Sequence, residues 1–174
     1  MAVKTSVAVI GALAVAGSLL ALTPAQARPD VVSFREAYEP GTIVVKTGQR
    51  RLYLVLGEGQ AVRYPVGVGK AGKQWAGTAR IDGKYRNPAW SPPADVKRDK
   101  PSIPDVIPGG SPANPMGVAA MTLSGGGQYA IHGTNVPNSV GGYVSYGCIR
   151  MYNEDITDLY SRVSVGTPVV VTAR

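Results

Sequence analysis

The chain contains one cysteine, Cys148, in the segment SYGCIRM, and one histidine, His132, in the segment AIHGTN. A thiol attacks a carbonyl efficiently only once it loses its proton, and a neighbouring imidazole is the usual base. The two residues are 16 positions apart, so a loop could bring them together across a cleft. Their types predict nucleophilic catalysis by Cys148, with His132 as general base.

Each residue alone has an ordinary structural interpretation, as a buried imidazole or as a buried apolar thiol. The pairing is what predicts chemistry. One cysteine forms no disulfide within the chain, and one His and one Cys at this spacing are too few ligands for zinc. We therefore expect no metal site.

The glycines beside the pair suit the same chemistry. Gly133 follows the histidine, and we expect its carbonyl to hold one imidazole N–H while the other ring nitrogen faces sulfur. Gly147 allows a tight turn before the nucleophile. We expect the amides of Gly147 and Cys148 to be free to bind an oxyanion, which is a large term in acyl transfer.

Arg150 lies two residues after the thiol. If this segment is extended, the Arg150 and Cys148 side chains share one face. A guanidinium there would bind a substrate carboxylate through two hydrogen bonds. The alternative is a surface ion pair of Arg150 with Glu154 or Asp155.

The elements around these motifs are mainly strands. Alternating apolar residues within 43–66 predict three strands joined by the turns KTGQR and GEGQ, the start of a β-meander. The segment 77–85 holds one more strand. VAAMTL (118–123) and QYAIHG (128–133) predict two further strands, the second of which ends near His132.

One helix is expected, over NEDITDLYSRV (153–163), with Asn153 as its N-cap, acidic residues in its first turn and an apolar stripe. VGTPVVVTA (165–173) then closes the chain as a strand. The fold class is mostly β, a sandwich or small barrel with one short helix in the C-terminal half and no second domain.

Two segments need separate interpretation. Residues 87–115 hold eight prolines and are too long for an idle connection. Trp90 and Ile103 are poor residues for disorder, so we expect an ordered flap beside the site. GVGKAG (67–72) matches G-x-G-x-x-G, but strand and turn residues follow it rather than a helix, so we expect a glycine-rich turn and no dinucleotide cofactor.

The N-terminus predicts export. Lys4, an apolar run and Ala25-Gln26-Ala27 are typical of a secretory signal, residues 1–27, cleaved after Ala27; the alternative is an uncleaved membrane anchor. Residues 28–40 are then a short lead and 41–174 one domain. The remaining net charge of about +6 (17 basic minus 11 acidic) suits anionic wall polymers or simple solubility, and its scatter argues against a nucleic-acid partner.

The two motifs together resemble the catalytic signature of the L,D-transpeptidase family, which has the YkuD-type fold. IHGTN is followed, after a glycine-rich stretch, by S-x-GCIRM. The resemblance runs from about Gly41 to Thr172 and includes NPAWSPP, PGG…ANPMG and VGTPVVV. It implies a β-sandwich domain in the bacterial periplasm or cell envelope, at the cell wall; we expect a monomer.

The resemblance also implies an activity without a cofactor. Cys148 would attack the L,D bond after the third residue of a peptidoglycan stem tetrapeptide, typically between diaminopimelate and D-alanine. D-Alanine would leave, and an amine of another stem or of an envelope protein would resolve the thioester. His132 would be the general base, and the Gly147 and Cys148 amides would bind the oxyanion. The expected substrate contacts are Arg150, Tyr146, Ser145 and Thr134.

Many family members carry a second histidine directly before the Gly-Cys pair, where this chain has Tyr146. An imidazole role at that position does not carry over; the tyrosine would donate through its hydroxyl or form a pocket wall. Two alternatives remain. One is an L,D-carboxypeptidase, in which water is the acceptor. The other is a non-catalytic peptidoglycan-binding module, for which an inert Cys148 would be the sign, as an accessible thiol of low pKa would be for an enzyme.

Overall fold

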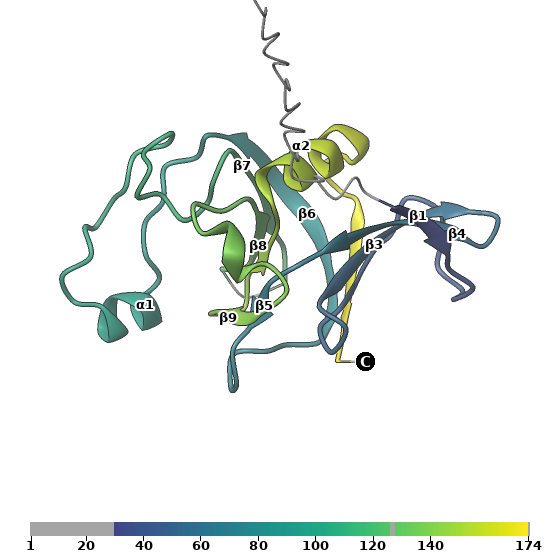
Figure 1. Cartoon of the computed structure of the whole chain (residues 1–174), viewed down its shortest axis with the longest axis horizontal. Helices are drawn as coiled ribbons and strands as arrows, with labels where there is room; N and C mark the ends of the chain where they lie inside the picture. The colour runs from purple at the N-terminus through teal and green to yellow at the C-terminus, as the bar shows by residue number, and fades with distance from the viewer. Residues whose placement is uncertain (1–29, 126–127, 174) are drawn as a thin grey trace, which may run out of the picture.

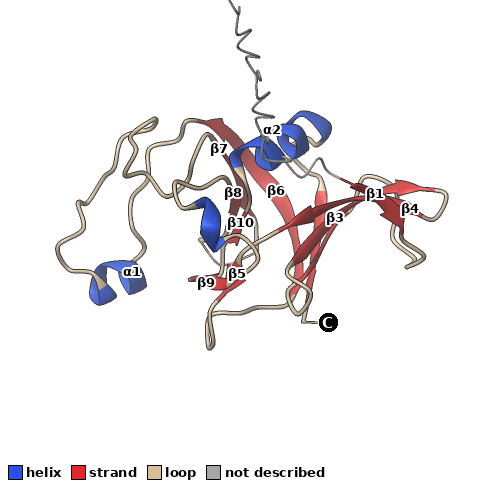
Figure 2. Cartoon of the chain, viewed as in Figure 1, coloured by secondary structure: helices blue, strands red, loops and turns tan. Residues whose placement is uncertain are grey.

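The computed structural model describes residues 30–125 and 128–173, and most of them lie in strands or loops (Figure 2). The signal expected over 1–27 lies outside the described residues. Within the described ranges, no helix has the length and apolar character needed to cross a membrane.

The N-terminal half contributes the larger part of the sheet. Its strands are β1 (Asp30–Ser33), β2 (Ile43–Lys46), β3 (Arg51–Gly57), β4 (Gln60–Pro65), β5 (Val68–Gly69) and β6 (Gly77–Arg86). The antiparallel pairs β2–β3 and β3–β4 are the meander that the alternating apolar pattern predicted. β1 adds a strand on the outer side of β4, within the segment expected to be only a lead.

The C-terminal half alternates short strands and helices. Its elements are α1 (Ala94–Asp99), β7 (Ala119–Leu123), β8 (Ala130–His132), the 3-10 helix η1 (Pro137–Ser139), β9 (Tyr143–Ser145), β10 (Ile149–Arg150), α2 (Asn153–Arg162) and β11 (Pro168–Thr172). α1 is an addition to the single helix expected from the sequence, because the proline-rich segment contains this short turn of helix.

The large sheet has the strand order β1-β4-β3-β2-β11-β6-β7-β8-β10, and β5 pairs separately with β9. β6 belongs to both halves of the large sheet. Its first residues, Gly77–Arg80, pair with β11, and from Ile81 onward it pairs with β7, with a register shift between Ile81 and Gly83. A long strand with an irregularity lets a sheet bend sharply, and Figure 1 shows β6 passing between the two groups of strands.

One core fills the space between the two halves. Leu52 and Tyr64 from the meander, Met121 and Ile131 from β7 and β8, and Leu159 from α2 are all fully buried in the same cluster. Burial of apolar side chains from both halves in one cluster is what defines a sandwich. The mostly β fold expected from the sequence is therefore confirmed.

The start of α2 differs from the prediction. Tyr152, not Asn153, is the N-cap, and Asn153 is the first helical residue. The Asn153 side chain faces the segment after β8, where its Oδ1 accepts the Thr134 amide at 3.0 Å and its Nδ2 donates to the Thr134 carbonyl at 3.0 Å. The side-chain amide therefore holds a neighbouring segment, whose two backbone groups have no other partner among the described residues, rather than capping its own helix.

The proline-rich segment, residues 87–115, forms a flap that extends from the body on the side away from β1 and β4 (Figure 1). Its base is closed by a pair of backbone hydrogen bonds between Trp90 and Ile107, 2.9 and 2.8 Å long. The buried Asn114 Nδ2 donates to the carbonyls of Pro88, Ile107 and Pro108 at 2.8–3.3 Å. One side chain thus replaces backbone donors that prolines lack, and the flap is ordered as expected.

Candidate active site

Strand pairing brings the two candidate residues together. β8 and β10 are parallel neighbours, with Ile131 opposite Ile149 and His132 opposite Arg150. Cys148 lies two residues before Arg150, so in extended chain its side chain points to the same face as Arg150 and His132. All three line one pocket of about 370 Å³.

The flap and the loop that follows His132 form the pocket walls. Apolar flap side chains that line it are Trp90, Pro93, Val96 and Ile103, with Pro115 and Met116 at the flap's end. Val136 and Val144 line it from the other side, together with Ser145 and Tyr146. Lys100 and Arg150 are also in the lining, and the described residues that form it include no carboxylate. The pocket is therefore apolar in its walls and cationic in its fixed charges.

His132 is held by the chain immediately after it. The side chain is 3% exposed, and Nδ1 lies 2.6 Å from the Gly133 carbonyl oxygen, as the sequence led us to expect. An acceptor at Nδ1 places the proton there and leaves Nε2 as the basic nitrogen. The His132 pKa is lowered to about 4, first by burial and then by the charge of Arg150, while hydrogen bonds to the Gly133 and Pro115 carbonyls partly oppose this lowering. The imidazole is accordingly neutral at physiological pH.

Cys148 is a half-buried thiol. Its Sγ lies 3.9 Å from the Gln128 carbonyl, and in the described part of the chain no hydrogen bond joins Sγ to the imidazole. Burial raises the pKa of Cys148, against a backbone hydrogen bond from Ala130 and the charge of Arg150. His132 and Cys148 therefore both favour their neutral forms. The thiol is not the thiol of low pKa that we expected from the sequence as the sign of an enzyme.

The turn that carries Cys148 is closed by hydrogen bonds of its own. Ser145 Oγ accepts the Gly147 amide at 3.1 Å and donates to the Cys148 carbonyl at 2.6 Å. The expectation of two free oxyanion amides is therefore wrong for Gly147, because a side chain in the same turn already takes that amide. Ser145 itself has its hydroxyl occupied within the turn, although it lines the pocket. Among the described residues, no protein acceptor takes the Cys148 amide.

Two aromatic residues fix the same turn from outside. Gly147 has φ +122°, and a Cβ there would lie 2.3 Å from the Tyr129 ring. Tyr129 stacks on Trp75, with ring centroids 4.8 Å apart, and Trp75 Nε1 donates to the Gly147 carbonyl at 2.9 Å. Sequence spacing gave no sign of Trp75 or Tyr129, because they reach the turn from 72 and 18 positions away.

Arg150 is anchored in the pocket rather than on the surface. Its Nη1 donates to Ser139 Oγ at 2.9 Å, and its backbone pairs with Gly67 through two 2.8 Å hydrogen bonds. No ion pair with Glu154 or Asp155 occurs among the described residues, so that alternative is wrong. Its buried Nε has no partner in the described chain, and burial lowers the Arg150 pKa. The guanidinium keeps donor capacity for an anion in the pocket.

Of the other two substrate contacts predicted from the sequence, Tyr146 and Thr134, one lines the pocket and the other does not. Tyr146 lines the pocket, as expected for a wall residue. Thr134 does not; it is 2% exposed, its backbone is held by Asn153, and its Oγ1 accepts the Val136 amide at 3.0 Å. Its position does not support a substrate contact. Lys100 is in the lining although the sequence did not single it out, because nothing in its flanking residues distinguishes it from the other flap lysine, Lys97.

Comparison with known proteins agrees with this geometry. Residues 40–171 match the family model described as YkuD, the L,D-transpeptidase catalytic domain. The Escherichia coli K12 protein named "Probable L,D-transpeptidase YbiS" is 38% identical over 136 residues, which are 73% of this chain and 43% of that protein. The chain thus spans less than half the length of that curated relative.

Solved structures show the same fold. An L,D-transpeptidase from Mycobacterium smegmatis matches with a TM-score of 0.58 and 21% identity, over 76% of this chain and 58% of that one. A Brucella melitensis structure described as a "Probable carnitine operon oxidoreductase caia" has a TM-score of 0.56 and 41% identity, over 87% and 96% of the two chains.

The description of the Brucella structure names a different chemistry from that of the other relatives. In this chain GVGKAG leads from β5 into a turn and then β6, so no helix N-terminus follows it to receive a pyrophosphate. Gly67 is instead used for close packing, since a Cβ there would lie 2.9 Å from the Ser139 carbonyl oxygen. The segment is the glycine-rich turn that was expected.

Proposed function

Because the chain belongs to the family of L,D-transpeptidase catalytic domains, we propose that it transfers the acyl group of a peptidoglycan stem tetrapeptide to an amine through a thioester on Cys148. The observation that carries this proposal is that the only thiol and the only imidazole of the chain line one pocket, beside the half-buried guanidinium of Arg150.

Because His132 and Cys148 are both neutral at rest, we propose that the thiol loses its proton during the attack and not before it. As Sγ attacks the carbonyl carbon of the third residue, Nε2 of His132 accepts the thiol proton, so no thiolate needs to accumulate beforehand. The tetrahedral intermediate collapses, the C–N bond breaks, and the imidazolium gives its proton to the departing D-alanine amine. The acceptor amine then attacks the thioester and passes a proton to Nε2, and the thiol is restored when sulfur leaves and takes that proton.

Two features of the site stabilise the charges that appear. The Cys148 amide, which no acceptor among the described residues takes, would donate to the oxyanion, and the Gly133 carbonyl at Nδ1 would stabilise the imidazolium. Gly147 contributes by shaping the turn, since its own amide binds Ser145. A single oxyanion amide from this turn implies that a second donor, if one is used, comes from elsewhere in the pocket.

The pocket suits an anionic, extended donor. Stem peptides carry several carboxylates, and the fixed charges in the lining are Lys100 and Arg150. Arg150 lies two residues from the nucleophile, within reach of the D-alanine carboxylate beside the scissile bond, where a bidentate pair would orient the leaving group. The apolar flap side chains exclude water from the thioester, which favours an amine acceptor over hydrolysis.

The silent binding module is the weaker candidate. A thiol buried only as apolar filler would not line a pocket together with a histidine and an arginine. The raised Cys148 pKa does mean that alkylation of the resting thiol is slow at neutral pH. Slow alkylation alone therefore does not separate the binding module from an enzyme that uses concerted proton transfer.

Export to the cell envelope is part of the proposal. The basic start and the small-residue cleavage motif of residues 1–27 support it, and the peptidoglycan substrate requires it. The donor is a stem tetrapeptide, the acceptor is a stem or protein amine, and we propose that the domain acts as a monomer without cofactor.

The experiment is product analysis by mass spectrometry after incubation with a disaccharide-tetrapeptide. A transpeptidase gives a 3-3 crosslinked dimer and free D-alanine, and a carboxypeptidase gives tripeptide and D-alanine. The matched control is Cys148→Ser, for which we expect no product. His132→Ala should slow acylation by roughly 100-fold or more, the usual effect of losing a general base. Unchanged substrate with folded wild-type protein would instead support the binding module.

A further inference from the structure

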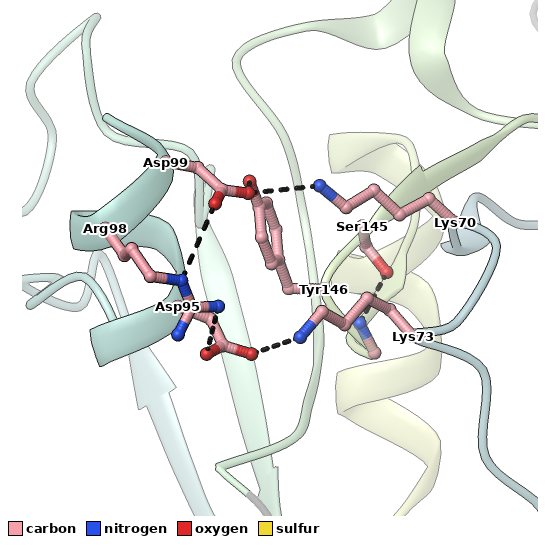
Figure 3. Close-up of polar contacts among 8 residues, drawn as sticks. Lys70, Lys73, Asp95, Arg98, Asp99, Ser145 and Tyr146 are labelled. Carbon is pink, nitrogen blue, oxygen red and sulfur yellow. Dashed lines mark hydrogen bonds and ion pairs between the residues drawn. The ribbon is translucent and has the colours of Figure 1, made fainter.

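A polar cluster connects the flap to the loop that carries the nucleophile (Figure 3). Tyr146, two residues before Cys148, donates its hydroxyl hydrogen bond to Asp99 Oδ2 at the end of α1. Lys70 forms an ion pair with the same Asp99 oxygen at 3.3 Å and lies 3.8 Å from the centroid of the Tyr146 ring. One carboxylate of the flap thus has two partners on the body of the protein.

A second ion pair lies beside the first. Lys73 pairs with Asp95, one helical turn before Asp99, and Arg98 pairs with Asp95 at 2.7 Å. Lys70 lies in the glycine-rich turn, and Lys73 and Trp75 directly follow it; the Trp75 indole donates to the Gly147 carbonyl. The segment 70–75 therefore braces the nucleophile and holds α1, so the positions of flap and thiol depend on neighbouring residues of one segment.

We propose that Asp99 is a positioning residue that acts through Tyr146, holding α1 against the loop that carries the nucleophile and thereby setting how tightly the donor peptide is bound. This inference rests on the proposed function for its substrate, but not for its contacts. α1 and its neighbours contribute Trp90, Val96 and Lys100 to the pocket wall. A flap released at α1 would withdraw that wall while leaving Cys148 and His132 in place.

The arrangement of the flap predicts which parameter changes. Asn114 and the Trp90–Ile107 pair hold the base of the flap independently of Asp99. Loss of the Asp99 contact therefore frees the tip and does not unfold the segment. Asp99 and Lys70 side chains are each 41% exposed, so each contact is of modest strength and the effect should be about fivefold rather than an all-or-none loss.

The test compares Tyr146→Phe, Asp99→Asn and the double variant. We expect each single variant to raise KM for the tetrapeptide about fivefold with little change in kcat, and to speed alkylation of Cys148 by a bulky maleimide by a similar factor. Because the Tyr146 hydroxyl acts through Asp99, whereas Asp99 also pairs with Lys70, the double variant should match Asp99→Asn rather than multiply the two single effects.

The matched control is Asp105→Asn. It removes another exposed ion pair of the flap, Lys97–Asp105 at 2.6 Å, which does not reach the nucleophile loop. We expect wild-type KM and alkylation rate for this variant.

Multiplicative effects in the double variant, or unchanged alkylation and KM in both single variants, would overturn the positioning role. So would equal effects of Asp105→Asn. The alkylation rates decide this even if wild-type protein fails to turn over the tetrapeptide, a result that would count against the proposed function instead.

Discussion

The titration of His132 offers the most quantitative prediction. Burial of the ring holds its pKa at about 4, against the 6.5 of an exposed histidine. At pH 5.5 a base with pKa 4 is about 97% neutral, whereas one with pKa 6.5 is about 9% neutral. If neutral His132 is the general base, kcat/KM at pH 5.5 should stay near its plateau, and its acid limb should lie near pH 4 rather than pH 6.5.

The same shift appears in stability. Since the folded pKa lies below the unfolded one, the unfolded chain binds more protons between pH 6.5 and about 4, and folding stability falls as pH decreases through that window. The full shift corresponds to about 3 kcal/mol. His132→Gln should remove this dependence. The difference between the two stability curves isolates it from carboxylates that titrate in the same range.

The assay is direct because the chain has one histidine. A single imidazole resonance followed by NMR from pH 3 to 8 gives its pKa without assignment of other histidines, and urea unfolding at several pH values gives the stability window. Arg150→Gln removes a nearby positive charge and should move the His132 pKa upward. An imidazole that titrates at 6.5 or above in the folded wild type would refute the neutral-pair mechanism.

Three further substitutions test separate parts of the structure. Gly147→Ala should destabilise the protein by about 1–3 kcal/mol and reduce acylation sharply, because φ +122° and the Tyr129 ring leave no room for a Cβ; a wild-type melting temperature and rate would contradict this. Asn114→Ala should lower urea stability by about 2 kcal/mol and expose Cys148 to alkylation, since the Pro88 carbonyl loses its side-chain donor and the Ile107 and Pro108 carbonyls each lose one of two donors; unchanged protection would contradict it. Burial raises the Asp155 pKa to about 6, above its unfolded value, so the contribution of Asp155 to stability falls as pH rises from about 4 to 6, opposite in sign to that of His132. Asp155→Asn should remove that loss and raise stability at pH 7 by about 1–3 kcal/mol, and a less stable variant at pH 7 would refute the assignment.

Local patterns predicted the parts of the fold that depend on local physics. Alternation of apolar residues located β2 to β4, and the apolar stripe located α2, because burial of one face imposes a period on the sequence. The position of His132 at a strand end and the Gly133 carbonyl at Nδ1 also follow from neighbours in the chain.

The predictions that proved wrong concerned side-chain hydrogen bonds to the backbone, one within a turn and one between distant segments. The Gly147 amide is occupied because it donates to Ser145 Oγ. The Asn153 side chain does not cap α2 because its Oδ1 accepts the Thr134 amide. The neutral state of Cys148 follows from desolvation, which pairing by residue type does not reveal. Residue types and their spacing in the sequence do not predict which polar atoms remain unpaired after the flap packs against the body.

The central claim is that Cys148 forms a covalent acyl intermediate with the donor. Intact-mass measurement of the protein after rapid mixing with a disaccharide-tetrapeptide, beside Cys148→Ser, tests it most directly. We predict a mass gain equal to the donor minus D-alanine in wild-type protein only, lost when an amine acceptor is added. Release of D-alanine at the wild-type rate by Cys148→Ser, or a folded wild type that acquires no adduct and gives no product, would contradict the account.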